Sequence, residues 1–287
     1  MKKICLLLMA ISLAFVSFSQ TTKIVNGDTI NKTDLKNLKQ GYWEETNNKF
    51  LLKGNYLNDK KDGIWVTYNF KELATKIESF RNGEKDGIII NIDDNGYYKG
   101  EANYRNDLLN GVSRTYAVGG KLLSDINYKN GVLNGSKKTY YESNNIMQEE
   151  ANYLNGQRDG ITKWYDTNGK LIAEYSYKNG KFEGVNKTYS ANGDVLVEET
   201  YVNNIQNGPY KEYFDIEPVV SQNTFSKDTD KKENVVNKED VSLKTTTVKL
   251  KVSGNYLNGK KDGKWLEYDD KGAVIKTIVY KDGVEKK

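Results

Sequence analysis

The sequence predicts an all-β protein, an elongated antiparallel β-meander of about nine β-hairpin repeats with one disordered inserted loop. Aromatic residues recur at a constant spacing along most of the 287-residue chain, and a glycine follows each at a fixed distance. Only 37% of residues are hydrophobic, yet there are 21 tyrosines, and the net charge is +4. Disorder usually requires few aromatic residues and a large net charge. The composition therefore favours a thin, tyrosine-rich β structure that buries little aliphatic surface.

Residues 1–19 are predicted to be a secretory signal peptide. Lys2 and Lys3 precede an apolar-biased run at 4–18, which is shorter than the ~20 residues that a membrane-spanning helix needs. Ser17 and Ser19 are small residues suited to a cleavage site before residue 20. We therefore expect an exported protein, periplasmic, on the cell surface or secreted, without an integral membrane segment after cleavage. An uncleaved membrane anchor is the alternative.

The histidine and cysteine content excludes several kinds of chemistry. The chain has no histidine, and its single cysteine, Cys5, lies inside the predicted signal peptide. Nucleophile systems that depend on histidine and imidazole metal sites are therefore excluded, as are disulfides in the mature chain. We expect a protein that is not an enzyme and has no catalytic residues, no metal site and no cofactor.

An internal repeat decides the fold prediction. The repeat aromatic residues are 24 or 25 residues apart except across one interval of 55. They are Tyr56, Phe80, Tyr104, Tyr128, Tyr153, Tyr177, Tyr201, Tyr256 and Tyr280. A repeat glycine stands seven residues after each of the first eight: Gly63, Gly87, Gly111, Gly135, Gly160, Gly184, Gly208 and Gly263. Self-similarity of this length is typical of repeat architectures.

Each repeat reads as one β-hairpin. The five residues after a repeat glycine, as in 63–68, alternate β-branched or aromatic with polar residues, which predicts a half-buried strand. Pairs such as Asn168-Gly169 then accept the positive φ of a tight turn. A second strand returns to the next repeat aromatic residue, and an Asn two residues later opens the next connection. We expect each repeat glycine to lie in that connection at positive φ.

These boundaries divide the chain into five parts. A lead-in at 20–40 precedes the repeats at 41–215, the first of which is a shorter copy that begins at Gly41. Tyr213 and Tyr256 are 43 residues apart, where the other repeats have 12 or 13. The extra segment, 216–247, is polar and aperiodic and predicts a flexible loop at a hairpin tip. The last repeats follow at 248–287.

At these residues the chain resembles the bacterial variant of the MORN repeat family. Tyr177, Asn179, Gly180, Gly184 and Tyr189 follow its pattern of an aromatic residue, Asn-Gly, a glycine and a second tyrosine. The resemblance covers about residues 41–283 without the inserted loop. It implies a curved antiparallel sheet that acts as a scaffold, a spacer or a partner-binding surface. Some members carry an antitoxin or immunity label, which is an analogy at the level of the fold.

Four aromatic residues are candidate ligand-facing positions. Trp43, Trp65, Tyr210 and Trp265 each stand two residues after the glycine of their repeat. They could form a stacking platform for a glycan or an apolar strip for a protein. The alternative is that residues one and five positions after the glycine form the core, while these tryptophans cap the ends of the array.

Other binding and catalytic functions have weaker support. Residues 91–96 partly resemble a calcium loop, but Ala102 stands where a bidentate Glu is required. Carboxylates such as Glu149, Glu150, Glu198 and Glu199 lie in the second strands of separate repeats, which favours a solvated face over a catalytic pair. The small net charge argues against nucleic acid. We therefore expect a non-enzymatic scaffold whose partner is another protein. A carbohydrate-binding module for peptidoglycan or surface glycan, and an immunity-type partner of a toxin, are the alternatives.

Overall fold

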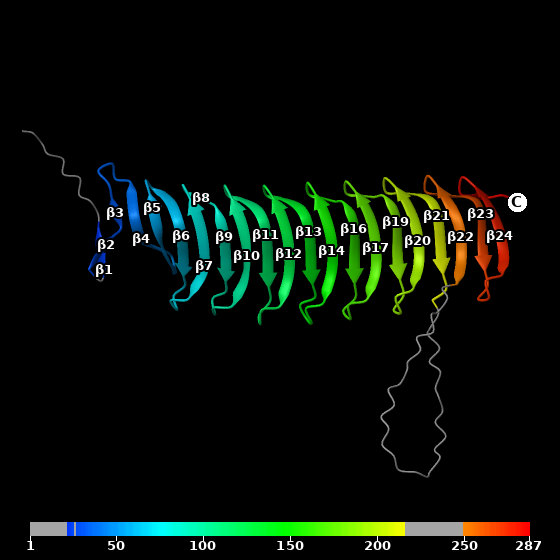
Figure 1. The fold of residues 1–287 in the computed structure, drawn as a ribbon, viewed down its shortest axis with the longest axis horizontal. Helices are drawn as coiled ribbons and strands as arrows, with labels where there is room; N and C mark the ends of the chain where they lie inside the picture. Colours follow the sequence, from blue (N-terminus) through cyan, green and yellow to red (C-terminus); the bar gives the residue numbers. More distant parts are fainter. Residues whose placement is uncertain (1–21, 26, 216–248) are drawn as a thin grey trace, which may run out of the picture. The chain divides into compact units, whose positions relative to one another are not determined.

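The computed structural model describes residues 22–25, 27–215 and 249–287, and its strands form two compact units, 1–108 and 109–287. In each unit, β-hairpins follow one another in chain order (Figure 1). The predicted signal peptide at 1–19 and the predicted flexible loop at 216–247 lie outside the described residues. None of the described residues belongs to a helix long and apolar enough to cross a membrane.

The described residues of the first unit form ten strands. They are β1 (Lys23–Val25), β2 (Asp28–Ile30), β3 (Lys32–Thr33), β4 (Lys39–Asn47), β5 (Phe50–Leu57), β6 (Lys60–Tyr68), β7 (Ala74–Arg81), β8 (Glu84–Lys85), β9 (Gly87–Ile92) and β10 (Tyr98–Arg105).

The second unit contains the remaining strands, the first of which begins at the unit boundary. They are β11 (Leu108–Tyr116), β12 (Leu122–Lys129), β13 (Val132–Tyr140), β14 (Met147–Leu154), β15 (Gln157–Arg158), β16 (Gly160–Tyr165), β17 (Leu171–Lys178), β18 (Lys181–Phe182), β19 (Gly184–Tyr189), β20 (Val195–Val202), β21 (Ile205–Tyr213), β22 (Leu250–Leu257), β23 (Lys260–Tyr268), β24 (Val274–Lys281) and β25 (Val284–Glu285).

The predicted hairpin repeat is confirmed. Nine hairpins pair a strand that carries a repeat glycine, or Gly41, with the strand that carries the next repeat aromatic residue. All pairings are antiparallel, and Gly184 lies opposite Tyr201 just as Gly160 lies opposite Tyr177. The all-β class and the repeat boundaries therefore follow from the sequence pattern.

The connection between consecutive hairpins turns earlier than the sequence analysis placed it. In the pair Asn179-Gly180 both residues have positive φ, 50° and 77°, as a two-residue type I′ turn requires. The N–H of Gly180 donates to the carbonyl of Arg158 at 2.8 Å, which fastens this turn to the preceding repeat. Because the turn closes at the Asn, the next strand resumes three residues before the repeat glycine.

The opposite ends of the hairpins carry a longer loop than the predicted tight turn. In residues 166–170, the N–H of Gly169 donates to the carbonyl of Asp166 and the N–H of Asp166 donates to the carbonyl of Lys170. This is a type I turn followed by a glycine at positive φ. The Asp166 carboxylate accepts hydrogen bonds from the N–H groups of Asn168 and Lys170, both at 2.8 Å. These two bonds hold the pKa of Asp166 below its ordinary value.

The repeat glycines have positive φ, as expected, but they lie within or at the start of a strand and not in the turn. Gly63 has φ 74° and Gly160 has φ 97°. Around Gly63, three residues of β6 (63–65) face only Gly54 of β5, because Asp62 pairs with Asn55 and Val66 with Lys53. The glycine therefore forms a β-bulge. Because the bulge adds two residues to β6 relative to β5, the faces continue to alternate across it, and Lys61 lies over Trp65 on one face.

The sheet has two chemically different faces. The repeat aromatic residues and the residues two positions after each repeat glycine share the aromatic face, whereas the residues one and three positions after the glycine share the opposite face. This opposite face is charged in the second unit, but in the first unit it carries aliphatic residues such as Val66 and Ile90. The prediction that the first residue after the glycine is a core position is wrong, since Ile64 is 53% and Ile161 is 50% exposed. The second residue after the glycine is in the core instead, as at Ile89 and Thr162.

Candidate functional site

The structure corrects the assignment of three candidate ligand-facing residues. Trp43, Trp65 and Trp265 are only 9%, 2% and 4% exposed, so they do not offer ring faces to a ligand. They pack on the aromatic face in the early and late hairpins. Tyr210 is the exception, because it lies half-buried on the same face, stacked on Trp265 with ring centroids 5.4 Å apart.

Trp65 and Trp265 occupy two copies of one local structure, one in each unit. Residues 54–65 and 254–265 share the pattern Gly-Asn-Tyr-Leu-Asn-x-Lys-Lys-Asp-Gly-x-Trp. In both copies the indole lies against the initial glycine, where an added Cβ would be 2.3 Å from Trp65 and 2.2 Å from Trp265. The indole N–H donates to the carbonyl of the following residue, Asn55 at 2.9 Å or Asn255 at 3.2 Å. The glycine is therefore needed because the ring occupies the space of its side chain.

A lysine covers each of these rings. Lys61 Nζ lies 4.4 Å from the ring centroid of Trp65, and Lys261 Nζ lies 4.2 Å from that of Trp265. Such cation–π contacts are worth about 0.5–2 kcal/mol each. The covered rings belong to the structural core of their units.

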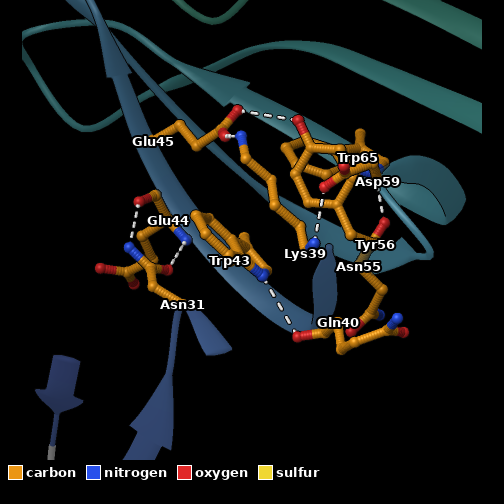
Figure 2. A network of polar contacts seen from close by, with 10 residues as sticks. All are labelled: Asn31, Lys39, Gln40, Trp43, Glu44, Glu45, Asn55, Tyr56, Asp59 and Trp65. Atoms are coloured by element: carbon orange, nitrogen blue, oxygen red, sulfur yellow. Dashed lines mark hydrogen bonds and ion pairs between the residues drawn. The ribbon is translucent and has the colours of Figure 1, made fainter. Parts of the chain in front are cut away.

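The first hairpin of the first unit adds a polar network to this arrangement (Figure 2). Lys39 lies over the rings of Trp43 and Tyr56, at 4.6 Å from each centroid, and forms an ion pair with Glu45. On the other side of the strand, the side-chain amide of Asn31 donates to the carbonyl of Glu44 and accepts from its N–H, at 3.0 and 2.8 Å. Asn31 thus satisfies backbone groups at the edge of β4, which limits pairing with another chain there.

The aromatic face of the second unit holds a connected group of rings. Trp164 contacts Tyr175 (centroids 4.9 Å apart), Tyr175 contacts Phe182 (5.5 Å), and Phe182 contacts both Tyr177 (4.9 Å) and Tyr201 (5.3 Å). All five rings are half-buried. The described strands of this unit contact one another as neighbours in the sheet, so no second layer of described residues covers these rings.

An ion-pair group borders this aromatic group. Glu149 is buried and pairs with Lys137 at 2.8 Å and with Arg158, whose guanidinium lies 5.3 Å from the ring centroid of Trp164. The hydroxyl oxygen of Thr162, a fully buried residue, has no hydrogen-bond partner among the described residues. The cation of Arg158 therefore occupies this part of the face, held by a carboxylate and by rings.

Glu199 lies further along the same face without a cationic partner among the described residues. It accepts hydrogen bonds from the Tyr201 hydroxyl at 2.8 Å and from the Gln206 side-chain amide at 3.1 Å. Tyr210 lies directly opposite it on β21. Burial raises the pKa of Tyr201 to about 12, and the hydrogen bond to Glu199 acts in the same direction. Burial likewise raises the pKa of Tyr256, with a further contribution from the negative charge of Glu199.

The charged face of the second unit carries a transverse row of alternating charges. Consecutive strands β11 to β21 place these residues opposite one another: Arg114, Asp125, Lys138, Glu150, Lys163, Glu174, Lys187, Glu198 and Lys211. Neighbours such as Lys163 and Glu174 form ion pairs, at 3.3 Å in this case. Directly opposed charges of opposite sign stabilise a register that a slip of one residue would destroy.

The repeat positions predicted as structural all lie in or at the ends of the strands. The repeat glycines form the bulges, and the repeat tyrosines, including Tyr104 and Tyr128, lie in the strands opposite them. Among the described residues, no group of three or more Asp, Glu, His or Cys side chains is placed to hold a metal ion.

Sequence reasoning missed two features that carried a detectable signal. The paired glycine–tryptophan structures could have been found from the shared pattern at 54–65 and 254–265. The alternating charge row could have been found by aligning the third residue after each glycine with the residue three before each repeat aromatic. Glu199 gave no such signal, because its lack of a cation depends on which side chains the strand pairing places beside it.

The fold defines a class of protein, a β-hairpin repeat protein. The MORN repeat variant family matches three consecutive segments, residues 133–155, 158–179 and 182–203. These segments are MORN-type repeats, and repeats of this kind suggest a binding or scaffold role. No curated protein matches the chain.

Proposed function

We propose that this chain is an exported, non-enzymatic scaffold that binds another protein through the aromatic face of its second unit. The observation that carries the proposal is the group of half-buried rings around Phe182, on a sheet face that no other described layer covers. Tyrosine, tryptophan and arginine are enriched in the centres of protein–protein interfaces. This face presents all three types within a few strands, including Arg158 beside Trp164.

The burial of Trp43, Trp65 and Trp265 favours a protein partner over a glycan. A platform for a sugar ring needs aromatic faces that are open, and Lys61 and Lys261 lie over two of these three indoles. The remaining rings of the aromatic face contact one another edge-on or at a tilt. They form an uneven amphipathic surface, which suits packing against side chains of a partner.

Two features of the sequence support the other parts of the proposal. The leader with Lys2, Lys3 and a short apolar run supports export. The absence of histidine, together with the engagement of buried Glu149 in ion pairs, supports a function without catalysis.

The binding surface can be tested with one variant on each face. Phe182→Lys should fold normally, because Lys61 and Lys85 stand at the equivalent position of other repeats. The mature chain is immobilised and exposed to envelope extract, whose retained protein and glycan fractions are analysed separately. We expect specific proteins on the unmodified chain and on the charged-face control Val185→Thr, and their loss on Phe182→Lys. Equal retention by Phe182→Lys, or retention of glycan alone, would contradict the proposal.

Export has its own test. Mass spectrometry of the protein from its native host should show a mature chain that begins at or near Gln20. An intact chain that begins at Met1 in the cytoplasmic fraction would refute export and leave the binding surface unaffected.

A further inference from the structure

The aromatic face of the second unit contains a carboxylate, Glu199, that lacks the cationic partners of the equivalent carboxylate in the first unit. In the first unit, Glu78 stands two residues before its repeat aromatic residue. It forms ion pairs with Lys76 at 2.7 Å and with Lys85 at 3.9 Å. Glu199 is at the equivalent position in the second unit. The two positions that carry Lys76 and Lys85 are occupied there by Val197 and Gln206, respectively.

Gln206 reaches Glu199 from the position where Lys85 reaches Glu78, and donates a neutral hydrogen bond at 3.1 Å. The other bond to this carboxylate comes from the Tyr201 hydroxyl, which is also neutral. Among the described residues, no lysine or arginine forms an ion pair with Glu199. The carboxylate is therefore hydrogen-bonded but not charge-compensated.

Aromatic rings surround this carboxylate. Tyr210 lies directly across from it, and Tyr256 lies beside Tyr210 with ring centroids 5.8 Å apart. On the other side, Phe182 contacts both Tyr201 and Tyr175. Burial and the charge of Glu199 together raise the pKa of Tyr175 and of Tyr256, so these hydroxyls stay protonated at neutral pH and add no negative charge of their own.

Other repeats of this chain show which side chains bind among a carboxylate and aromatic rings. Where a repeat has a cation at the position of Gln206, that cation lies on the rings of the aromatic face. Lys61 lies 4.4 Å from the ring centroid of Trp65, and Arg158 lies among Tyr153, Trp164 and Tyr177 while it pairs with Glu149. A carboxylate and several rings together form a favourable site for an organic cation.

We propose that Glu199, with Tyr175, Tyr201, Tyr210 and Tyr256, binds a lysine or arginine side chain of the protein partner. This inference rests on the proposed function and adds the chemistry of the contact. The partner's ammonium or guanidinium group supplies the charge that Lys76 supplies to Glu78, since Val197 stands at that position here, and the rings contact its aliphatic stem. Charge complementarity selects the occupant, because a neutral or acidic side chain would leave Glu199 uncompensated.

Blocked single amino acids test the site directly. N-acetyl-lysine amide and N-acetyl-arginine amide are titrated into the full mature chain, with N-acetyl-norleucine amide as the neutral probe, and binding is followed by NMR. Glu199→Gln removes the charge and retains a hydrogen-bond acceptor, and Gln206→Lys supplies an internal cation as Lys85 does. We expect the cationic probes to bind at least tenfold more weakly to both variants. Glu150→Gln, on the charged face, should bind them as the unmodified chain does.

Several results would overturn the inference: no binding of either cationic probe, equal binding by the variants, or equal binding of the norleucine probe. A lysine-containing peptide that binds no better than free methylammonium would show a site for small amines and not for a partner's side chain. The proposed function is tested separately, because Glu199→Gln can be exposed to the same envelope extract as Phe182→Lys. Proteins retained at an unchanged level by Glu199→Gln but lost with Phe182→Lys would refute only the cation site.

Discussion

The glycine that lies beneath Trp265 should be far less replaceable than the repeat glycine of the same hairpin. In Gly254→Ala the new Cβ would be 2.2 Å from Cδ2 of the indole. Restoring an ordinary carbon–carbon separation of about 3.5–4.0 Å requires the ring to move by roughly 1.5 Å. Trp265 is buried, and its N–H donates to the carbonyl of Asn255. The ring therefore has no free space into which it can move without losing contacts.

The cost can be compared with that of Gly263→Ala. Overpacking of a core costs about 1–3 kcal/mol, and loss of the indole hydrogen bond adds about 1 kcal/mol. We expect a loss of about 3 kcal/mol for Gly254→Ala. A Cβ added at Gly263 would meet no heavy atom within 4 Å, but the φ of this residue is +73°. Gly263→Ala should therefore cost only the strain of a left-handed backbone, about 1 kcal/mol.

Urea denaturation followed by far-ultraviolet circular dichroism gives the total loss, and hydrogen exchange of the peptides that contain β22 and β23 shows where protection is lost. The double variant Gly254→Ala/Trp265→Leu removes the clash. It should therefore be less stable than Trp265→Leu alone by no more than about 1 kcal/mol, and the double-mutant cycle gives the coupling between the two residues. If Gly254→Ala costs no more than Gly263→Ala, the steric account of this glycine fails.

Three further predictions concern polar groups. Thr162→Val removes the buried hydroxyl that has no partner and should raise the free energy of unfolding by about 1 kcal/mol in urea titrations; a loss of stability would imply an unseen partner. The pKa of Tyr201 in the folded state, about 12, lies above the ordinary value of 10.0, so the stability that its hydroxyl contributes is complete below pH 10 and is lost as the pH rises towards 12. Between these pH values the free energy of unfolding should therefore fall less for Tyr201→Phe than for the unmodified chain, and the same pH profile for both would contradict this. Asp166→Ala removes two turn hydrogen bonds and should lower the Tm at pH 7; because the pKa of Asp166 is depressed, the deficit should shrink as the pH falls below about 4, and a deficit that stays constant would exclude the role of the carboxylate.

The sequence by itself determined the repeat and the order of its parts. Tyr177, Gly184 and Tyr189 recur in phase because each hairpin repeats the same local geometry, and a local geometry of turns and alternating strands is encoded by neighbouring residues. The positive φ at Gly160 could also be predicted, since only a residue without Cβ adopts that conformation without strain. Period and turn chemistry were therefore sufficient for the fold class.

Only the tertiary structure decided which side chains share a face. Strand alternation is compatible with either set of side chains being buried, and the structure buries Trp65 and exposes Ile64. The site at Glu199 depends on the pairing of β20 with β21, because Gln206 lies opposite Tyr201 and its side chain is within hydrogen-bond distance of Glu199. A slip of one residue in pairing would reverse the face of every following side chain, and the sequence period is the same in either case.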